Sequence, residues 1–116
     1  MAKSKNFSES ELVCSCCGES GVQQWALDKL QAIRDDYGKP MTITSSYRCS
    51  DHPVERSKAK AGTHSMGIAF DVHVHSGNER YELVSLAMKH GANGIGVDKN
   101  FVHIDFRDTI RVVWVY

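Results

Sequence analysis

The 116-residue sequence predicts an α+β fold in a single domain over residues 1–116, with two principal helices and a mainly antiparallel sheet. Residues 21–37 carry apolar residues at the three- and four-residue spacing that is typical of an amphipathic helix, and a capping box predicts the start of a second helix. Several short segments alternate apolar and polar residues, as strands with one buried face do. Short turns join these segments, which favours the antiparallel arrangement.

The first helix is expected over residues 21–37. Ser20 is a candidate N-cap, and Gly38 followed by Pro40 predicts the end. One apolar stripe runs along this helix and consists of Val22, Ala26, Leu30, Ile33 and Tyr37.

Short strands are expected on both sides of a long polar loop. "MTITSS", residues 41–46, is rich in β-branched residues, and residues 47–63 are expected to form a loop with one helical turn. "AFDVHV", residues 69–74, alternates cleanly. Its two faces are Phe70, Val72 and Val74 on one side, and Ala69, Asp71 and His73 on the other.

The second helix is expected over residues 77–90, because Ser76 and Glu79 have the spacing of a capping box and Gly91 predicts the end. Three further strands follow, at 94–97 ("GIGV"), 101–106 ("FVHIDF") and 109–116 ("TIRVVWVY"). In the middle one, Val102, Ile104 and Phe106 share one face, and Phe101, His103 and Asp105 share the other.

Charge and hydropathy exclude several classes of partner. The 14 basic and 14 acidic residues cancel, so we expect neither nucleic acid nor an anionic membrane as a partner. No stretch approaches the ~20 apolar residues that span a bilayer. "MAKSKNFSES" lacks the apolar segment of a secretory signal, so synthesis in the cytoplasm is expected.

Two histidines and one aspartate form a candidate metal site. If the strands that carry Asp71 and His103 are neighbours, about 4.8 Å apart, both side chains can enter one cleft. His64 lies seven residues before Asp71, and Gly67 permits the bend that would bring it back. Two imidazoles and a carboxylate, with a fourth position open to water, suit a catalytic zinc site. Taken alone, the pattern also fits ordinary structural histidines.

Three motifs in order make the metal site more specific. "HSMGIAFD", residues 64–71, resembles the H-S-x-G-x-A-x-D signature of zinc D-alanyl-D-alanine peptidases, the M15 group, which includes phage endolysins. "TSSYRC", residues 44–49, is similar to the family's S-x-Y-R segment. "NFVHIDFR", residues 100–107, is similar to the segment that carries its last histidine ligand. The resemblance covers most of the chain and implies a fold like that of the Hedgehog signalling domain.

The resemblance implies a role for each matched polar residue. His64, Asp71 and His103 would bind one Zn²⁺, which would lower the pKa of its bound water and polarise a substrate carbonyl. Arg48 would face the cleft, where it could hold a substrate carboxylate or stabilise an oxyanion. A surface salt bridge is the alternative for Arg48.

The sequence departs from the family pattern at the position of the general base. Some members carry an acidic residue three positions before the last ligand, where this chain has Asn100, and others carry a histidine where this chain has Phe101. Asp98 is the best substitute for proton transfer, although it also fits a plain turn aspartate. Asp105 could orient a ligand or pair with an arginine. His73 could contact substrate or be an exposed strand residue.

Four cysteines leave three alternatives open: free thiols, a disulfide from Cys14 or Cys17 to Cys49, or a second metal site that also involves Cys16. Zinc ribbons use two C-x-x-C pairs, and the lone Cys49 does not fit that spacing. A nucleic-acid or protein adaptor built on a cysteine-rich zinc knuckle is disfavoured by this spacing and by the neutral charge.

The residues and the resemblance together predict a monomeric zinc metallopeptidase that hydrolyses an amide bond in peptidoglycan stem peptides. The bond could be a terminal D-Ala-D-Ala, an L-Ala-D-Glu link or a cross-bridge. Such a domain would act at the cell wall, released by a phage or carried on a virion. The alternative is a catalytically weak or inactive metal-binding domain of a phage particle, because Asn100 stands where a base is expected.

Overall fold

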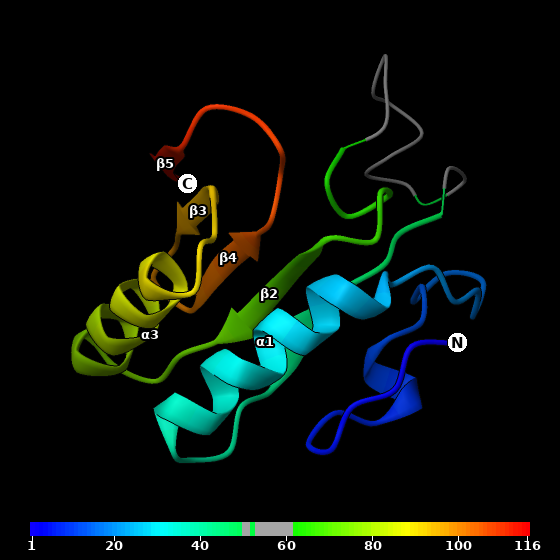
Figure 1. Ribbon diagram of the computed structural model, residues 1–116, viewed down its shortest axis with the longest axis horizontal. Helices are drawn as coiled ribbons and strands as arrows, with labels where there is room; N and C mark the ends of the chain where they lie inside the picture. Colours follow the sequence, from blue (N-terminus) through cyan, green and yellow to red (C-terminus); the bar gives the residue numbers. More distant parts are fainter. Residues whose placement is uncertain (50–51, 53–61) are drawn as a thin grey trace.

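The computed structural model describes residues 1–49, 52 and 62–116 and shows an α+β fold (Figure 1). The predicted helical turn within residues 47–63 lies outside the described residues. The elements are η1 (Glu9–Glu11), α1 (Gln24–Tyr37), β1 (Ile43–Ser45), β2 (Ala69–His73), α3 (Gly77–Lys89), β3 (Gly94–Val97), β4 (Phe101–Asp105) and β5 (Val112–Val115).

The described strands form one mixed sheet with the order β1-β2-β4-β3-β5. The pairs β1–β2, β2–β4 and β4–β3 are antiparallel, which confirms the prediction of a mainly antiparallel sheet. β5 returns alongside β3 in the parallel direction. The central position of β2 and β4 matters for function, because these two strands carry Asp71 and His103.

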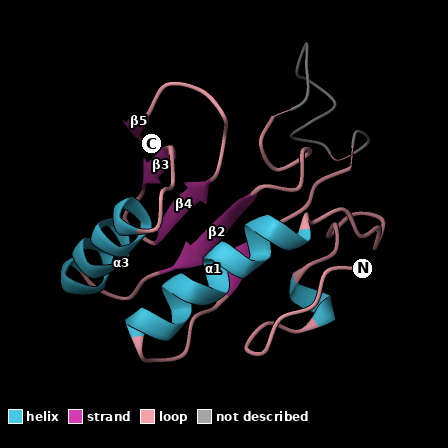
Figure 2. Cartoon of the chain, in the orientation of Figure 1, coloured by secondary structure: helices cyan, strands magenta, loops and turns pink. Residues whose placement is uncertain are grey.

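Helices α1 and α3 lie together on one face of the sheet (Figure 2). The core lies between the sheet and these two helices. It consists of the apolar face that the alternation predicted for β2 and β4 and of the apolar side chains of both helices that pack against it. Its largest fully buried members include Phe70, Val72, Val102, Ile104, Leu27, Leu30, Ile33 and Leu83. The odd-numbered positions of both strands therefore face away from the helices, on the opposite side of the sheet.

The start of α1 differs from the prediction. The helix begins at Gln24 with Gln23 as N-cap, not at Gly21 with Ser20 as cap. Residues 20–23 are held in extended contacts instead: Ser20 pairs with Val13, and the Gln23 amide donates to the Gly67 carbonyl at 2.8 Å. Tertiary hydrogen bonds thus replace the first helical turn that the apolar spacing suggested.

The second helix and its cap follow the sequence closely. The Ser76 hydroxyl accepts the Glu79 amide at 3.1 Å, as an N-cap does, while the Glu79 carboxylate accepts the His75 amide at 2.9 Å. Gly91, just beyond the helix, has a φ of 84°. Within the described residues, no helix has the length and apolar character needed to cross a membrane.

The N-terminal arm, residues 1–23, lies beside α1 (Figure 1), and its η1 turn contacts the edge strand β1. The Ser46 hydroxyl donates to the Glu11 carbonyl at 2.7 Å, and the Ile43 amide donates to the Glu11 carboxylate at 3.2 Å. Phe7 and Leu12 anchor the arm in the core. The arm therefore supports the segment that follows β1, which leads into the site.

Candidate metal centre and its cavity

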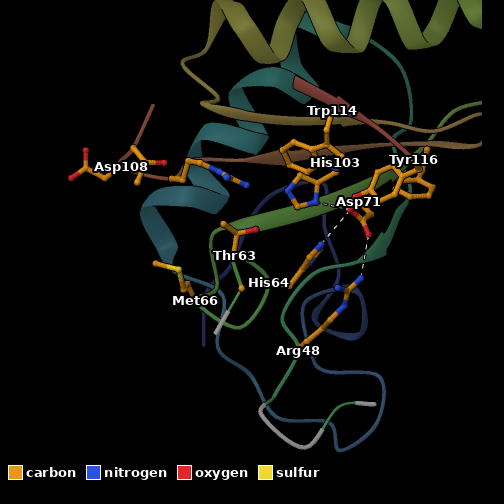
Figure 3. A pocket seen from close by; sticks show the side chains of 13 residues that line it. Arg48, Thr63, His64, Met66, Asp71, His103, Asp108, Trp114 and Tyr116 are labelled. Atoms are coloured by element: carbon orange, nitrogen blue, oxygen red, sulfur yellow. Dashed lines mark hydrogen bonds and ion pairs between the residues drawn. The ribbon is translucent and has the colours of Figure 1, made fainter. Parts of the chain in front are cut away.

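Asp71 and His103 are direct partners in the sheet. The antiparallel register pairs Asp71 of β2 with His103 of β4, and His103 Nδ1 lies 3.1 Å from Asp71 Oδ1. His64, on the loop before β2, brings its Nε2 within 3.3 Å of the same oxygen (Figure 3). One ligand atom from each residue lies within 4.8 Å of the other two, and all three side chains are buried. The structure therefore gathers the three residues that the sequence predicted as metal ligands.

Gly67 makes the return of His64 possible, as the sequence suggested. Its φ of 75° closes a turn in which the Gly67 amide donates to the His64 carbonyl at 3.2 Å. A Cβ at this position would also collide with the Gly21 carbonyl oxygen. A side chain at Gly67 would thus displace the loop that carries His64.

The outer nitrogen of each imidazole is held by an acceptor. His64 Nδ1 donates to the Ser46 carbonyl at 2.6 Å, and His103 Nε2 donates to the Asp105 carboxylate at 2.7 Å. In a neutral ring the other nitrogen then presents its lone pair to the Asp71 carboxylate. Lone pairs and a carboxylate repel one another unless a cation lies between them. This donor set, with nitrogen and oxygen only, fits a zinc ion.

The close contacts within the centre shift the pKa values of Asp71 and His103 in opposite directions. Burial opposes ionisation of Asp71, but its contacts with His103 and His64 outweigh this effect and hold its pKa well below the usual range. Burial likewise disfavours a charged His103, yet Asp105 and Asp71 raise the pKa of its imidazole overall. The centre therefore keeps an anionic carboxylate at neutral pH and attracts a positive charge.

Asp105 performs both roles that the sequence left open. It is fully buried, and besides accepting from His103 it accepts from Arg107 through Nε at 2.8 Å and Nη2 at 2.7 Å. Gly94, its partner on β3, leaves the space that this carboxylate occupies, because a Cβ there would collide with it. Asp105 thus orients His103, and Arg107 holds Asp105.

The centre opens into a cavity of about 820 Å³. Trp114 of β5 forms part of its wall, with its ring 4.9 Å from the His103 ring and 5.2 Å from the Arg107 guanidinium carbon. Trp114 reaches His103 over Gly96, whose missing side chain leaves room for the indole. Phe101 and Tyr116, with ring centroids 5.0 Å apart, add further aromatic surface. The cavity is therefore an open, partly aromatic pocket with the three donors in its wall.

Arg48 lines the cavity, which is where the resemblance implied it would be. Its Nη2 lies 3.4 Å from Asp71 Oδ2 (Figure 3), and its Nε donates to the Ser45 hydroxyl at 3.2 Å. The guanidinium is thus part of the site rather than of a remote surface salt bridge.

Asp98 and His73 make other contacts. The Asp98 carboxylate accepts the Asn100 amide at 2.9 Å, which is the turn role that the sequence also allowed. The His73 ring packs edge-on against His75, with centroids 4.5 Å apart. Neither belongs to the described residues that line the cavity, and the carboxylates that do are Asp71 and Asp108.

Asp108 of the cavity lining and three groups around the metal centre escaped sequence reasoning. The Ser46 carbonyl is a backbone group, which no residue pattern reveals. Arg107 stands two residues after Asp105, and this spacing could have suggested their pairing. Trp114 reaches the site only because β5 lies parallel beside β3, a pairing that the sequence did not indicate.

Comparison with known proteins places the chain in a family. A search of the curated proteins found no match to it. The family model described as Peptidase M15 matches residues 5–105, a range that contains His64, Asp71 and His103. Because the match spans most of the 116 residues, the chain belongs to the peptidase M15 family.

Proposed function

We propose that the chain is a zinc metallopeptidase that hydrolyses an amide bond in peptidoglycan stem peptides. One observation carries this proposal: His64, Asp71 and His103 aim three donors at one point in the wall of an open cavity, beside the guanidinium of Arg48. Membership of a peptidase family supports the reaction class.

The hydrogen bonds of the site suggest a role for each residue around the metal. His64 Nε2, His103 Nδ1 and the Asp71 carboxylate would hold zinc, while Ser46 and Asp105 keep the two rings in the required tautomer. Zinc bound there would polarise the scissile carbonyl and activate water for attack. Both histidines are only 4% exposed, so their orientation is set by the protein before substrate arrives.

Arg48 and the aromatic wall support a small anionic peptide as substrate. The Arg48 guanidinium can exchange its 3.4 Å contact with Asp71 for a substrate carboxylate or for the oxyanion that forms during attack. Stem peptides carry such carboxylates on short, compact residues. The cavity volume of about 820 Å³ lies within the usual range for small-ligand sites.

We assign proton transfer to Asp108 rather than to Asp98. Asp108 is the carboxylate of the described cavity lining that no metal-site histidine engages, and it lies at the edge of the pocket (Figure 3). Its side chain is exposed, so it can move towards bound substrate. Asp98→Asn should therefore leave the turnover rate nearly unchanged, and Asp108→Asn should lower it.

The substrate class suggests the place of action. We propose that the protein is made in the cytoplasm, acts as a monomer at the cell wall, and reaches it by phage release or on a virion.

A hydrolysis assay tests the proposed function directly. Zinc-loaded protein is incubated with purified stem peptides that contain the D-Ala-D-Ala, L-Ala-D-Glu and cross-bridge bonds, and mass spectrometry identifies the products. We expect one bond to be cut, and chelation followed by added zinc should abolish and then restore the cleavage. Stoichiometric zinc at the histidine site without turnover on any of these peptides would favour the inactive metal-binding domain.

A further inference from the structure

We propose that Cys14, Cys16, Cys17 and Cys49 form a second zinc site, with a structural role. All four are free thiols, and their sulfur atoms all lie within 4.8 Å of one another. Cys14 Sγ lies 3.5 Å from Cys16 Sγ and 3.6 Å from Cys49 Sγ. Cys16 Sγ and Cys49 Sγ are 3.4 Å apart.

These separations match those of a tetrahedral zinc site. A Zn–S bond of about 2.3 Å gives sulfur–sulfur edges of about 3.8 Å in a tetrahedron. The observed distances of 3.4–3.6 Å differ from this edge by a few tenths of an ångström, which small side-chain rotations supply. Four sulfurs would fill all four positions around zinc, and a closed tetrathiolate site is structural rather than catalytic.

The backbone around Cys14 is folded into a tight turn that gathers three of the thiols. The Gly18 amide donates to the Cys14 carbonyl at 2.8 Å, and the Cys14 amide donates to the Glu19 carbonyl at 2.8 Å. Gly18 has a φ of 73°, which lets the chain reverse directly after Cys17. Cys14 and Cys17 thus form a C-x-x-C pair followed by glycine, with Cys16 between them.

Cys49 completes the cluster from a different part of the chain. Its amide donates to Cys14 Sγ at 3.3 Å, a contact that stabilises negative charge on the sulfur. Both Cys14 and Cys49 are buried, while Cys16 and Cys17 are exposed. A single disulfide would use two of these sulfurs and leave two unused, whereas one zinc ion uses all four.

The second zinc would tie the N-terminal arm to the segment that builds the metal centre. Cys49 directly follows Arg48, and Ser46, whose carbonyl orients His64, lies three residues before Cys49. The Arg48 amide also donates to the His64 carbonyl at 3.3 Å. The cysteine site would therefore hold residues 46–49 in the conformation that the histidine site requires.

Metal analysis of the full chain tests this inference. Protein purified with reductant and zinc should hold about two equivalents of zinc, and His103→Ala should hold about one. Cobalt-loaded His103→Ala should still show the thiolate-to-metal charge-transfer absorption. The Cys14→Ser/Cys49→Ser double variant should also hold about one equivalent, and its cobalt form should lack that absorption. Ser15→Ala, within the same turn, is the matched control and should behave as the wild type.

X-ray absorption of the zinc-loaded wild type tests the same inference in a protein without substitutions, so the result does not depend on whether the cysteine variants fold. A shell of sulfur ligands at about 2.3 Å is expected beside the nitrogen and oxygen shell. A spectrum with nitrogen and oxygen ligands alone, or a disulfide in the reduced, zinc-treated protein, would overturn the inference. Such a result would leave the proposed peptidase untouched, since zinc bound through His103 and stem-peptide cleavage are measured separately.

Discussion

The two candidate metal sites of this protein differ in how the chain builds them. The histidine centre, formed by His64, Asp71 and His103, rests on paired strands whose register is set by the core behind them. The cysteine cluster, formed by Cys14, Cys16, Cys17 and Cys49, rests on a tight turn and on the segment after β1. One has three nitrogen and oxygen donors that face a cavity, and the other has four sulfurs that would enclose a metal.

This difference shows why one chain can carry two zinc sites with separate tasks. A site for catalysis needs an open position, while a structural site gains most from a closed shell of ligands. Residues 46–49 connect the two, because Ser46 orients His64 and Cys49 contacts Cys14. Predictions that separate the two sites therefore test the comparison best.

Loss of His103 should have the largest effect. In His103→Ala, stem-peptide hydrolysis should fall to the background rate, and zinc content should fall from about two equivalents to about one. Zinc analysis and product quantification by mass spectrometry check this. His90→Ala is the matched control, because His90 pairs with Asp36 at 2.7 Å on the helical side of the molecule. Equal losses in both variants would contradict the assignment.

Substitution of Arg48 should separate chemistry from metal binding. Arg48→Gln should lower kcat by roughly 100- to 1,000-fold, the usual effect of removing one oxyanion donor, while both zinc ions stay bound. Steady-state kinetics beside zinc analysis give the answer. Arg80→Gln is the control, since Arg80 donates to the carbonyls of Asp98 and Lys99 instead. Loss of zinc from Arg48→Gln would show that Arg48 acts on the fold of the site.

Asp105 should affect only the histidine centre. Asp105→Asn should weaken zinc binding there by roughly 10- to 100-fold, because the amide orients and polarises His103 less well than the carboxylate does. Gly94→Ala should act in the same direction, since the added Cβ displaces this carboxylate. Competition with a chromophoric chelator measures the affinity. Weaker binding at the cysteine cluster instead would break the distinction between the two sites.

Acid should destabilise the metal-free protein because it protonates the Asp105 carboxylate beside the histidine centre. Despite its burial, contacts with Arg107 and His103 hold the pKa of Asp105 below its usual value. The stabilisation is therefore present above an unfolded pKa of about 3.9 and is lost as pH falls through the folded pKa, by up to about 2–3 kcal/mol. Urea unfolding between pH 5 and pH 2 should show this decline, and Asp105→Asn should show a smaller one. An equal fall in the free energy of unfolding in the wild type and in Asp105→Asn would contradict this role of Asp105.

Much of this arrangement could be predicted from local pattern. The alternation in residues 69–74 and 101–106 identified which side chains enter the core and which face the site. The capping signals at Ser76 and Gly91 located the second helix. These predictions succeeded because strand periodicity and caps depend on neighbouring residues. The first helix begins later than its apolar spacing suggested, since Gln23 is held by Gly67.

The sequence by itself determined the fold class and the apolar faces of β2 and β4, because residue type and spacing encode both, whereas the three donors were singled out by the resemblance to a peptidase family and not by spacing alone. Only the tertiary structure decided that Asp98 stays in its turn, that Trp114 reaches His103, and that the fourth cysteine joins the other three. Cys49 lies 32 residues beyond Cys17, and such a contact depends on how the arm and the sheet edge pack together. Local rules do not reach over that separation, since it is the burial of a shared core that brings distant segments together.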